Sequence, residues 1–253
     1  METDLIEVIT NFITTHVDVT LFLFLTFLGY LTLLFIVRWV HLRCYVKIPF
    51  NVILKISIEK FGKFYSPDYY TASVFKSLSG YNNNKIVANY YQTIYVKTWN
   101  KTNIYVSFFY YLILSIAFSN NYFFSLLFGF SFVRFFSRCS EISIAFFHDV
   151  INKPEKSIYK RNTFLTKYER IHLAAVSYVE IYFLSAAMYL TIKPSSENCL
   201  NSIVDSLSVG SLTNVGRVVS GPSTSVDLYV FVQVFTTLVL IIMSLAVYVG
   251  REK

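Results

Sequence analysis

Apolar residues gather in long continuous blocks along this chain, and polar or charged residues fill the segments between the blocks. The blocks Val19–Val40, Ile171–Ile192 and Asp227–Val249 contain few charged side chains. A helix needs about 20 such residues to cross the roughly 30 Å hydrocarbon core of a bilayer. Each of the three blocks is long enough, so the pattern predicts three transmembrane helices.

Two shorter apolar blocks, Ile104–Ser119 and Tyr122–Ser137, are separated only by Asn120 and Asn121. A single helix across 104–137 would be much longer than a bilayer is thick. A polar pair at the centre suits the tip of a tight helical hairpin instead. We therefore predict a transmembrane hairpin here, and five transmembrane helices in an all-α membrane protein.

The charges between the blocks predict the orientation of the helices. Residues 1–18 hold acidic side chains and no Lys or Arg, whereas 41–103 hold nine Lys or Arg and 138–170 hold seven. Cytoplasmic loops of membrane proteins carry the excess of Lys and Arg. We therefore expect the N-terminus outside, both basic segments in the cytoplasm, 193–226 outside, and a cytoplasmic tail at 250–253.

The composition agrees with a multi-pass protein of a cell membrane, since 55% of the residues are hydrophobic and 19% are aromatic. The net charge of +7 does not indicate nucleic-acid binding, because the Lys and Arg residues are spread among the apolar blocks. Membrane lipid is the partner that this composition predicts.

The start of the first basic segment, 47–61, alternates charged and bulky apolar side chains. One interpretation is an amphipathic helix along the inner leaflet, with Lys55 and Lys60 near lipid phosphates. The other is a small helical cap in the cytoplasm. The residues alone leave both interpretations open.

Residues 171–249 follow the order helix, short helix, Gly-containing turn, Pro-bearing loop, helix. Ile203–Leu207 begins the short helix, Leu212–Val218 forms the turn, and Gly221–Thr224 leads into the last helix. This third of the chain resembles the pore module of tetrameric potassium channels. The resemblance implies a homotetramer with a re-entrant pore helix and a filter-like loop. The selectivity filter would then consist of Thr213, Asn214, Val215, Gly216, Arg217 and Val218.

The turn also departs from a potassium filter. Arg217 replaces the usual aromatic residue and Val218 replaces the second glycine. Carbonyl groups stacked toward the axis need backbone angles that glycine, here Gly216, adopts more readily than a residue with a Cβ atom. Two guanidinium charges 8 Å apart also repel by roughly 2 kcal/mol at an effective dielectric of about 20. We therefore expect a pore that is not strictly potassium-selective.

Further polar residues lie within the predicted spans. Thr236 and Thr237 would line the pore with hydroxyl groups, or would bond to carbonyls of their own helix. Glu180 would act in gating or as a proton-sensitive group, or would be a paired or protonated carboxyl that locks its helix to Tyr or Ser neighbours, which we favour. Arg134, Arg138 and Glu141 share one side of a helix at spacings of four and three, which predicts ion pairing at the inner interface. Two arginines, at 134 and 138, are too few for a voltage sensor.

No spacing of Cys, His or acidic residues indicates a metal site, and no nucleophile lies in a motif with a base. We expect neither an enzyme nor a cofactor, and only permeant ions as small ligands. The leading hypothesis is a potassium-channel-like, pore-forming homotetramer. The alternative is a non-conducting membrane interaction or regulatory protein that retains the pore-domain fold.

Overall fold

The computed structural model describes residues 2–43, 46, 49–82, 84–117, 121–151, 163–192, 199–219 and 224–243. Every regular element within these ranges is helical, so the predicted all-α class is confirmed. The elements are α1 (Glu2–Arg43), α2 (Phe50–Lys60), a 3-10 turn (Phe61–Lys63), α3 (Pro67–Ser79), α4 (Lys85–Ala117), α5 (Asn121–Ile151), α6 (Lys167–Ile192), α7 (Cys199–Gly210), α8 (Gly216–Val219) and α9 (Thr224–Leu238), which continues as a π-helical turn (Val239–Met243).

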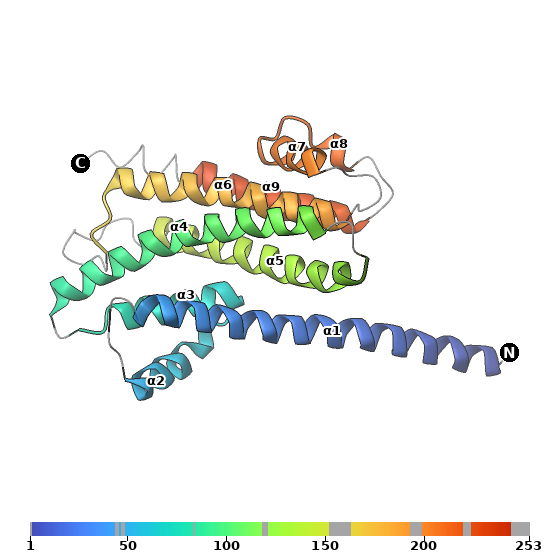
Figure 1. Ribbon diagram of the computed structural model, residues 1–253, viewed down its shortest axis with the longest axis horizontal. Coiled ribbons are helices and arrows are strands. Elements are labelled where there is room, and N and C mark those ends of the chain that lie inside the picture. Colours follow the sequence, from blue (N-terminus) through green and yellow to red (C-terminus); the bar gives the residue numbers. More distant parts are fainter. Residues whose placement is uncertain are drawn as a thin grey trace.

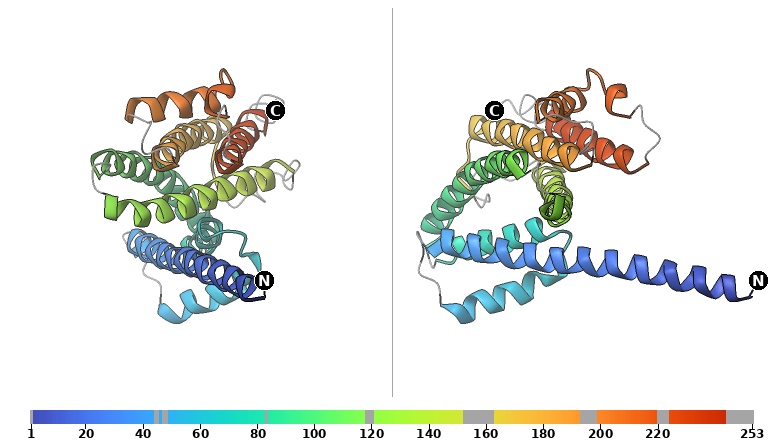
Figure 2. Two further views of the ribbon diagram at one scale, coloured as in Figure 1. Left: turned by 90° about the vertical axis from the view of Figure 1, so that its right-hand side faces the viewer. Right: turned by 45° about the vertical axis from the view of Figure 1, so that its right-hand side comes forward.

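The long helices are stacked in layers (Figure 1), and α5 crosses α1 at an angle that the turned views show (Figure 2). Helices α1 and α3 form one layer, α4 and α5 the next, and α6 with α9 the third; α7 and α8 lie on the far side of that third layer. Helix α1 projects beyond the other helices toward the N-terminus, as Figure 1 and the right view of Figure 2 show. The layering brings α6 into contact with α4, α5, α7 and α9.

Among the described residues, two helices are long and apolar enough to cross a membrane, Thr20–Arg43 within α1 and Tyr168–Ile192 within α6. Val226–Ile242 is apolar but shorter. These three segments match the three long apolar blocks of the sequence. Association with a membrane is therefore indicated by α1 and α6, and the full five-span topology stays a prediction.

The predicted hairpin corresponds to α4 and α5, but both helices are longer than the apolar blocks. Helix α4 starts at Lys85 instead of residue 104, because no Gly or Pro interrupts the sequence between them. The predicted boundary of the basic segment at residue 103 therefore falls inside a continuous helix. Asn120 lies outside the described residues.

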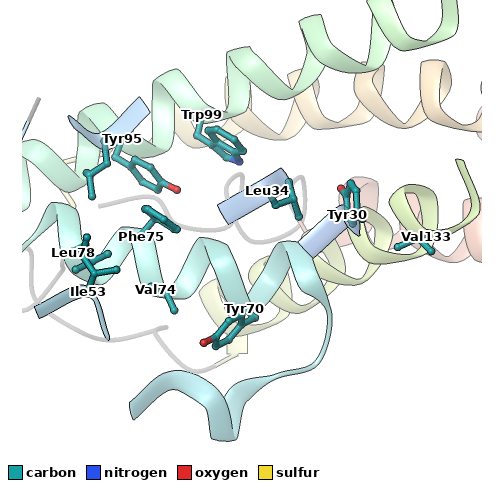
Figure 3. Close-up of a cluster of buried hydrophobic side chains, with 11 residues drawn as sticks. Tyr30, Leu34, Ile53, Tyr70, Val74, Phe75, Leu78, Tyr95, Trp99 and Val133 are labelled. Carbon is teal, nitrogen blue, oxygen red and sulfur yellow. The ribbon is translucent and has the colours of Figure 1, made fainter. Parts of the chain in front are cut away.

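The segment predicted to be amphipathic forms α2, which packs on α3. Ile53 of α2 joins Val74, Phe75 and Leu78 of α3 in a buried cluster that extends to Tyr95 and Trp99 of α4 and Tyr30 and Leu34 of α1 (Figure 3). The opposite side of α2 and the following turn exposes Leu54, Ile58 and Phe61. Both interpretations allow the helix that the structure shows, and the position of α2 at the inner leaflet remains a prediction.

Candidate functional site

Helix α7 runs alongside α6 in the opposite direction. The Ser206 hydroxyl donates to the Tyr182 carbonyl at 2.7 Å, and one turn later the Tyr178 hydroxyl donates to the Gly210 carbonyl at 3.1 Å. Residue numbers therefore rise along α7 as they fall along α6. At 1.5 Å per residue, Tyr182 lies about 15 Å from the end of α6 at Ile192. The end of α7, beside Tyr178, is further still from Ile192.

A buried glutamine joins α7 to both neighbouring helices. The Gln233 amide nitrogen of α9 donates to the Ser206 carbonyl at 2.8 Å. Its amide oxygen accepts from the Tyr189 hydroxyl of α6 at 2.7 Å. Because both polar ends of a fully buried side chain are paired, this contact sets the register of α6, α7 and α9.

Gly210, the last residue of α7, lies close to α6. A Cβ atom at this position would be 2.3 Å from the Tyr182 ring, which is shorter than any tolerable contact. The glycine therefore allows α7 to end directly against α6. The backbone N–H of Ser211 then bonds to the Leu207 carbonyl at 2.9 Å, and that of Thr213 bonds to the Ser208 carbonyl at 3.1 Å, so the turn folds back on α7.

The turn that follows α7 is polar and exposed. Ser211, Thr213 and Asn214 are exposed, and the Ser211 and Thr213 hydroxyls are 2.9 Å apart. Leu212 has φ of 60°, which a residue with a side chain rarely adopts. This strained turn therefore holds hydroxyl and amide groups that no other described part of the chain covers.

The second half of the predicted filter is helical and differs from the expected loop. Gly216–Val219 form the short helix α8, and Gly216 does not have a positive φ. A Cβ atom at Gly216 would meet nothing within 4 Å, so nothing in this subunit requires glycine at position 216, contrary to the prediction. A physical reason for the helical conformation is the burial of Val218. Its side chain belongs to one apolar cluster with Val226 and Val230, and the helical turn allows that burial. The Arg217 side chain is outside the described part of the structure.

The return of α8 completes a loop that starts and ends at the same end of α6. Val218 lies in one buried cluster with Tyr189 of α6 and with α9. Tyr189 is close to the end of α6, whereas Tyr178, which binds Gly210, is several turns further in. Residues 199–219 therefore enter along α6 and come back toward its Ile192 end.

The two threonines proposed to line a pore are instead buried within the subunit. Thr236 and Thr237 are each only 1% exposed. The Thr236 hydroxyl donates to the Val232 carbonyl at 2.8 Å, the back-bonding that was the alternative interpretation. The exposed side of α9 carries large apolar residues, Leu228, Phe231 and Phe235.

Glu180 is fully buried and faces α5. Its two carboxylate oxygens accept from the Arg138 guanidinium at 2.7 and 2.8 Å. The favoured interpretation of a paired carboxyl is confirmed, although the partner is an arginine and not a Tyr or Ser. Arg138 also forms the predicted ion pair with Glu141, one turn along α5. A gating role for Glu180 stays a prediction.

Arg138 belongs to a larger buried cluster that the sequence did not reveal. Arg38 of α1 lies 3.7 Å from an Asp68 oxygen of α3 and 3.6 Å from a Glu141 oxygen of α5. Three arginines and three carboxylates are buried together, so their formal charges balance. They are Arg38, Arg134, Arg138, Asp68, Glu141 and Glu180.

Polar and aromatic groups complete this charged cluster. The Tyr30 hydroxyl donates to an Asp68 oxygen at 2.7 Å, and Arg134 donates to the Ser107 hydroxyl at 3.1 Å. The Arg38 guanidinium lies 4.2 Å from the centre of the Trp99 ring. The only indication of this charged cluster in the sequence was a lone charged residue, such as Arg38, within an otherwise apolar block. Among the described residues, no group of three His, Cys, Asp or Glu side chains could hold a metal ion.

Comparison with models of known protein families, with curated proteins and with solved structures gives no match.

Proposed function

We propose that this protein is a multi-pass membrane protein that forms a homotetrameric, potassium-channel-like pore, with the turn 211–215 at its axis. Helices α6 and α9 would be the outer and inner helices of the pore module, and α7 would be the re-entrant pore helix. The N-terminus would lie outside the cell and the C-terminus in the cytoplasm, as the distribution of Lys and Arg predicts.

The depth of the exposed turn 211–215 is the main support. If α6 crosses a bilayer, Tyr182 lies about halfway through the roughly 30 Å hydrocarbon core, and the turn lies beside a deeper part of α6. Non-helical polar backbone at that depth is stable only against protein or a water-filled cavity. Since its own chain leaves the turn exposed, copies of the subunit around a wet axis would cover it.

The surfaces beside the turn suit contacts between subunits. Helix α7 exposes Leu200, Val204 and Leu207 at helical spacing, and α9 exposes Phe231 and Phe235 as a stacked pair. Large apolar side chains on the two helices that flank a polar turn fit packing against a second copy of the same module. The hydroxyl and amide groups of the turn would then face the axis.

The altered filter argues against strict potassium selectivity. A potassium filter replaces the hydration shell of the ion with rings of backbone carbonyls. The helical α8 takes the place of the outer part of that ladder. Thr213 and Asn214 would instead present side-chain oxygens, and Arg217 would add positive charge near the mouth. A weakly selective or anion-permeable pore fits these residues better.

Flux through reconstituted protein tests this proposal. Purified protein in liposomes is expected to release potassium, sodium or chloride down a gradient. In a background with the native cysteines replaced, Asn214→Cys should react with a small charged thiol reagent, and the reaction should block the flux. Thr237→Cys, at a buried position, is the matched control and should stay unreactive. No flux of any of the three ions would refute conduction.

The alternative is a non-conducting membrane protein that uses the pore fold for assembly. The helical conformation of 216–219 favours it, because no carbonyl ladder exists in that segment of the subunit. In that case tetramers would form, Asn214→Cys would be shielded from the reagent, and liposomes would stay tight.

A further inference from the structure

A hollow of about 360 Å³ lies on the surface between α4 and α6. Ligand pockets span about 300–1,000 Å³, so this hollow is at the small end of the range and could hold part of one hydrocarbon chain of a lipid. Its lining is mostly apolar and aromatic, with basic residues at one end. The lining residues are Lys101, Ile104, Tyr105, Phe108, His172, Val176 and Phe183.

The two helices that form the hollow run side by side in the same direction. Lys97 pairs with Glu169, the Asn100 amide donates to the Leu173 carbonyl at 3.0 Å, and the Phe108 and Phe183 rings meet at 5.2 Å. Residue numbers rise together along these contacts. The basic residues of both helices therefore lie at the same end of the hollow, and the Phe pair lies at the other.

Spacing places the lining side chains on one side of each helix. In α4, Ile104, Tyr105 and Phe108 follow Lys101 at three, four and seven residues, and in α6 Val176 follows His172 at four. In each helix, therefore, a nitrogen-bearing side chain lies at the N-terminal end of the hollow, and apolar side chains follow it toward the C-terminal end. This is the order of groups along a phospholipid, from phosphate to acyl chain.

The charge at the basic end is available to a ligand. Lys101 and His172 are exposed, and neither forms an ion pair with a carboxylate in the described ranges. The acidic residue Glu169 pairs with Lys97, which lies one turn away from Lys101. Glu169 therefore neutralises Lys97 and leaves the charge of Lys101. In the proposed orientation, α4 and α6 both enter the bilayer from the cytoplasm, and Lys101 and His172 lie at the inner headgroup level.

We propose that this hollow binds an anionic phospholipid of the inner leaflet. The lipid phosphate contacts the Lys101 ammonium and a His172 ring N–H, and one acyl chain lies along Ile104, Phe108 and Val176 up to Phe183. Basic pockets between membrane helices on the cytoplasmic side recognise anionic headgroups in this way. The inference rests on the proposed orientation but not on conduction.

Native mass spectrometry of the purified protein, titrated with dioleoyl phosphatidylglycerol or with the phosphatidylcholine of the same chains, tests the site. The wild type should retain phosphatidylglycerol more tightly. Lys101→Ala should weaken that binding about five-fold, the effect of one interfacial charge worth about 1 kcal/mol. Lys101→Arg should preserve binding, and Lys85→Ala, at the exposed start of α4, is the matched control that should also preserve it.

A second variant tests the acyl chain. Val176→Trp should fill the hollow and reduce retention of both lipids equally, because it removes the space and leaves the charge. Equal binding of the two lipids by the wild type, or unchanged binding by both Lys101→Ala and Val176→Trp, would overturn the proposal. Since binding is measured without a gradient, a protein that conducts nothing can still pass this test, and a conducting protein can fail it.

Discussion

Removal of one member of the buried Arg138–Glu180 pair should destabilise the protein strongly, and removal of both should cost less than the sum of the two single removals. Glu180 accepts two hydrogen bonds from Arg138, and both side chains are almost entirely buried. Glu180→Gln keeps the shape but leaves the surrounding cluster with one uncompensated positive charge. Breaking a buried ion pair in this way costs about 3–5 kcal/mol. We expect Glu180→Gln to lower the free energy of unfolding by about 3 kcal/mol or more.

The double variant Arg138→Met/Glu180→Met removes one charge of each sign, so the cluster stays neutral. Glu141 loses Arg138 but remains 3.6 Å from Arg38. The double variant should therefore lose less stability than the sum of Arg138→Met and Glu180→Met, by about 0.5–3 kcal/mol, the usual coupling between contacting residues. Burial of a neutral, well-packed pair of Met side chains can even be stabilising.

The assay is equilibrium unfolding in mixed micelles with increasing dodecyl sulfate, followed by far-UV circular dichroism at one fixed protein concentration, because assembly would shift the midpoint. Glu169→Gln, at the exposed pair with Lys97, is the matched control and should leave the unfolding curve unchanged. A Glu180→Gln curve that overlays the wild type, or additive effects in the double variant, would refute this reasoning about buried charge.

Three further predictions concern α7 and the turn. Gly210→Ala should reduce stability in the same unfolding assay, because its Cβ would overlap the Tyr182 ring. Gly216→Ala is the control and should leave stability unchanged, so equal unfolding curves for the two variants would contradict the close packing at Gly210. Gln233→Leu should cost about 2 kcal/mol, since it leaves two buried polar partners unpaired, and a neutral effect would show that the contact is not structural. The double change Arg217→Tyr/Val218→Gly should raise cation over anion permeability in liposome flux assays, and unchanged selectivity would show that these residues do not face the ion.

Features that depend on one stretch of sequence were predictable. The all-helical class and the three long apolar segments follow from composition and block length, because a helix satisfies its own backbone hydrogen bonds. The Arg138–Glu141 pair follows from spacing of three within one helix. These are local properties, and a single sequence contains them.

Features that depend on how helices turn toward each other were not predictable. The pairing of Arg38 with Asp68 joins two helices that are far apart in the sequence, and neither residue indicates its partner. Thr236 and Thr237 lie in the middle of an apolar helix, and that position alone allows either a pore lining or bonding to carbonyls of their own helix. Their burial depends on the rotation of α9, which Gln233 determines through contacts with α6 and α7.

The most direct test of a pore built around the turn 211–215 is a density map of the intact protein in lipid nanodiscs. The account predicts four copies around one axis, with the turn facing that axis at the depth of the acyl chains. A map that places the turn outside the lipid headgroups, or that contains single subunits without a shared central cavity, would contradict it.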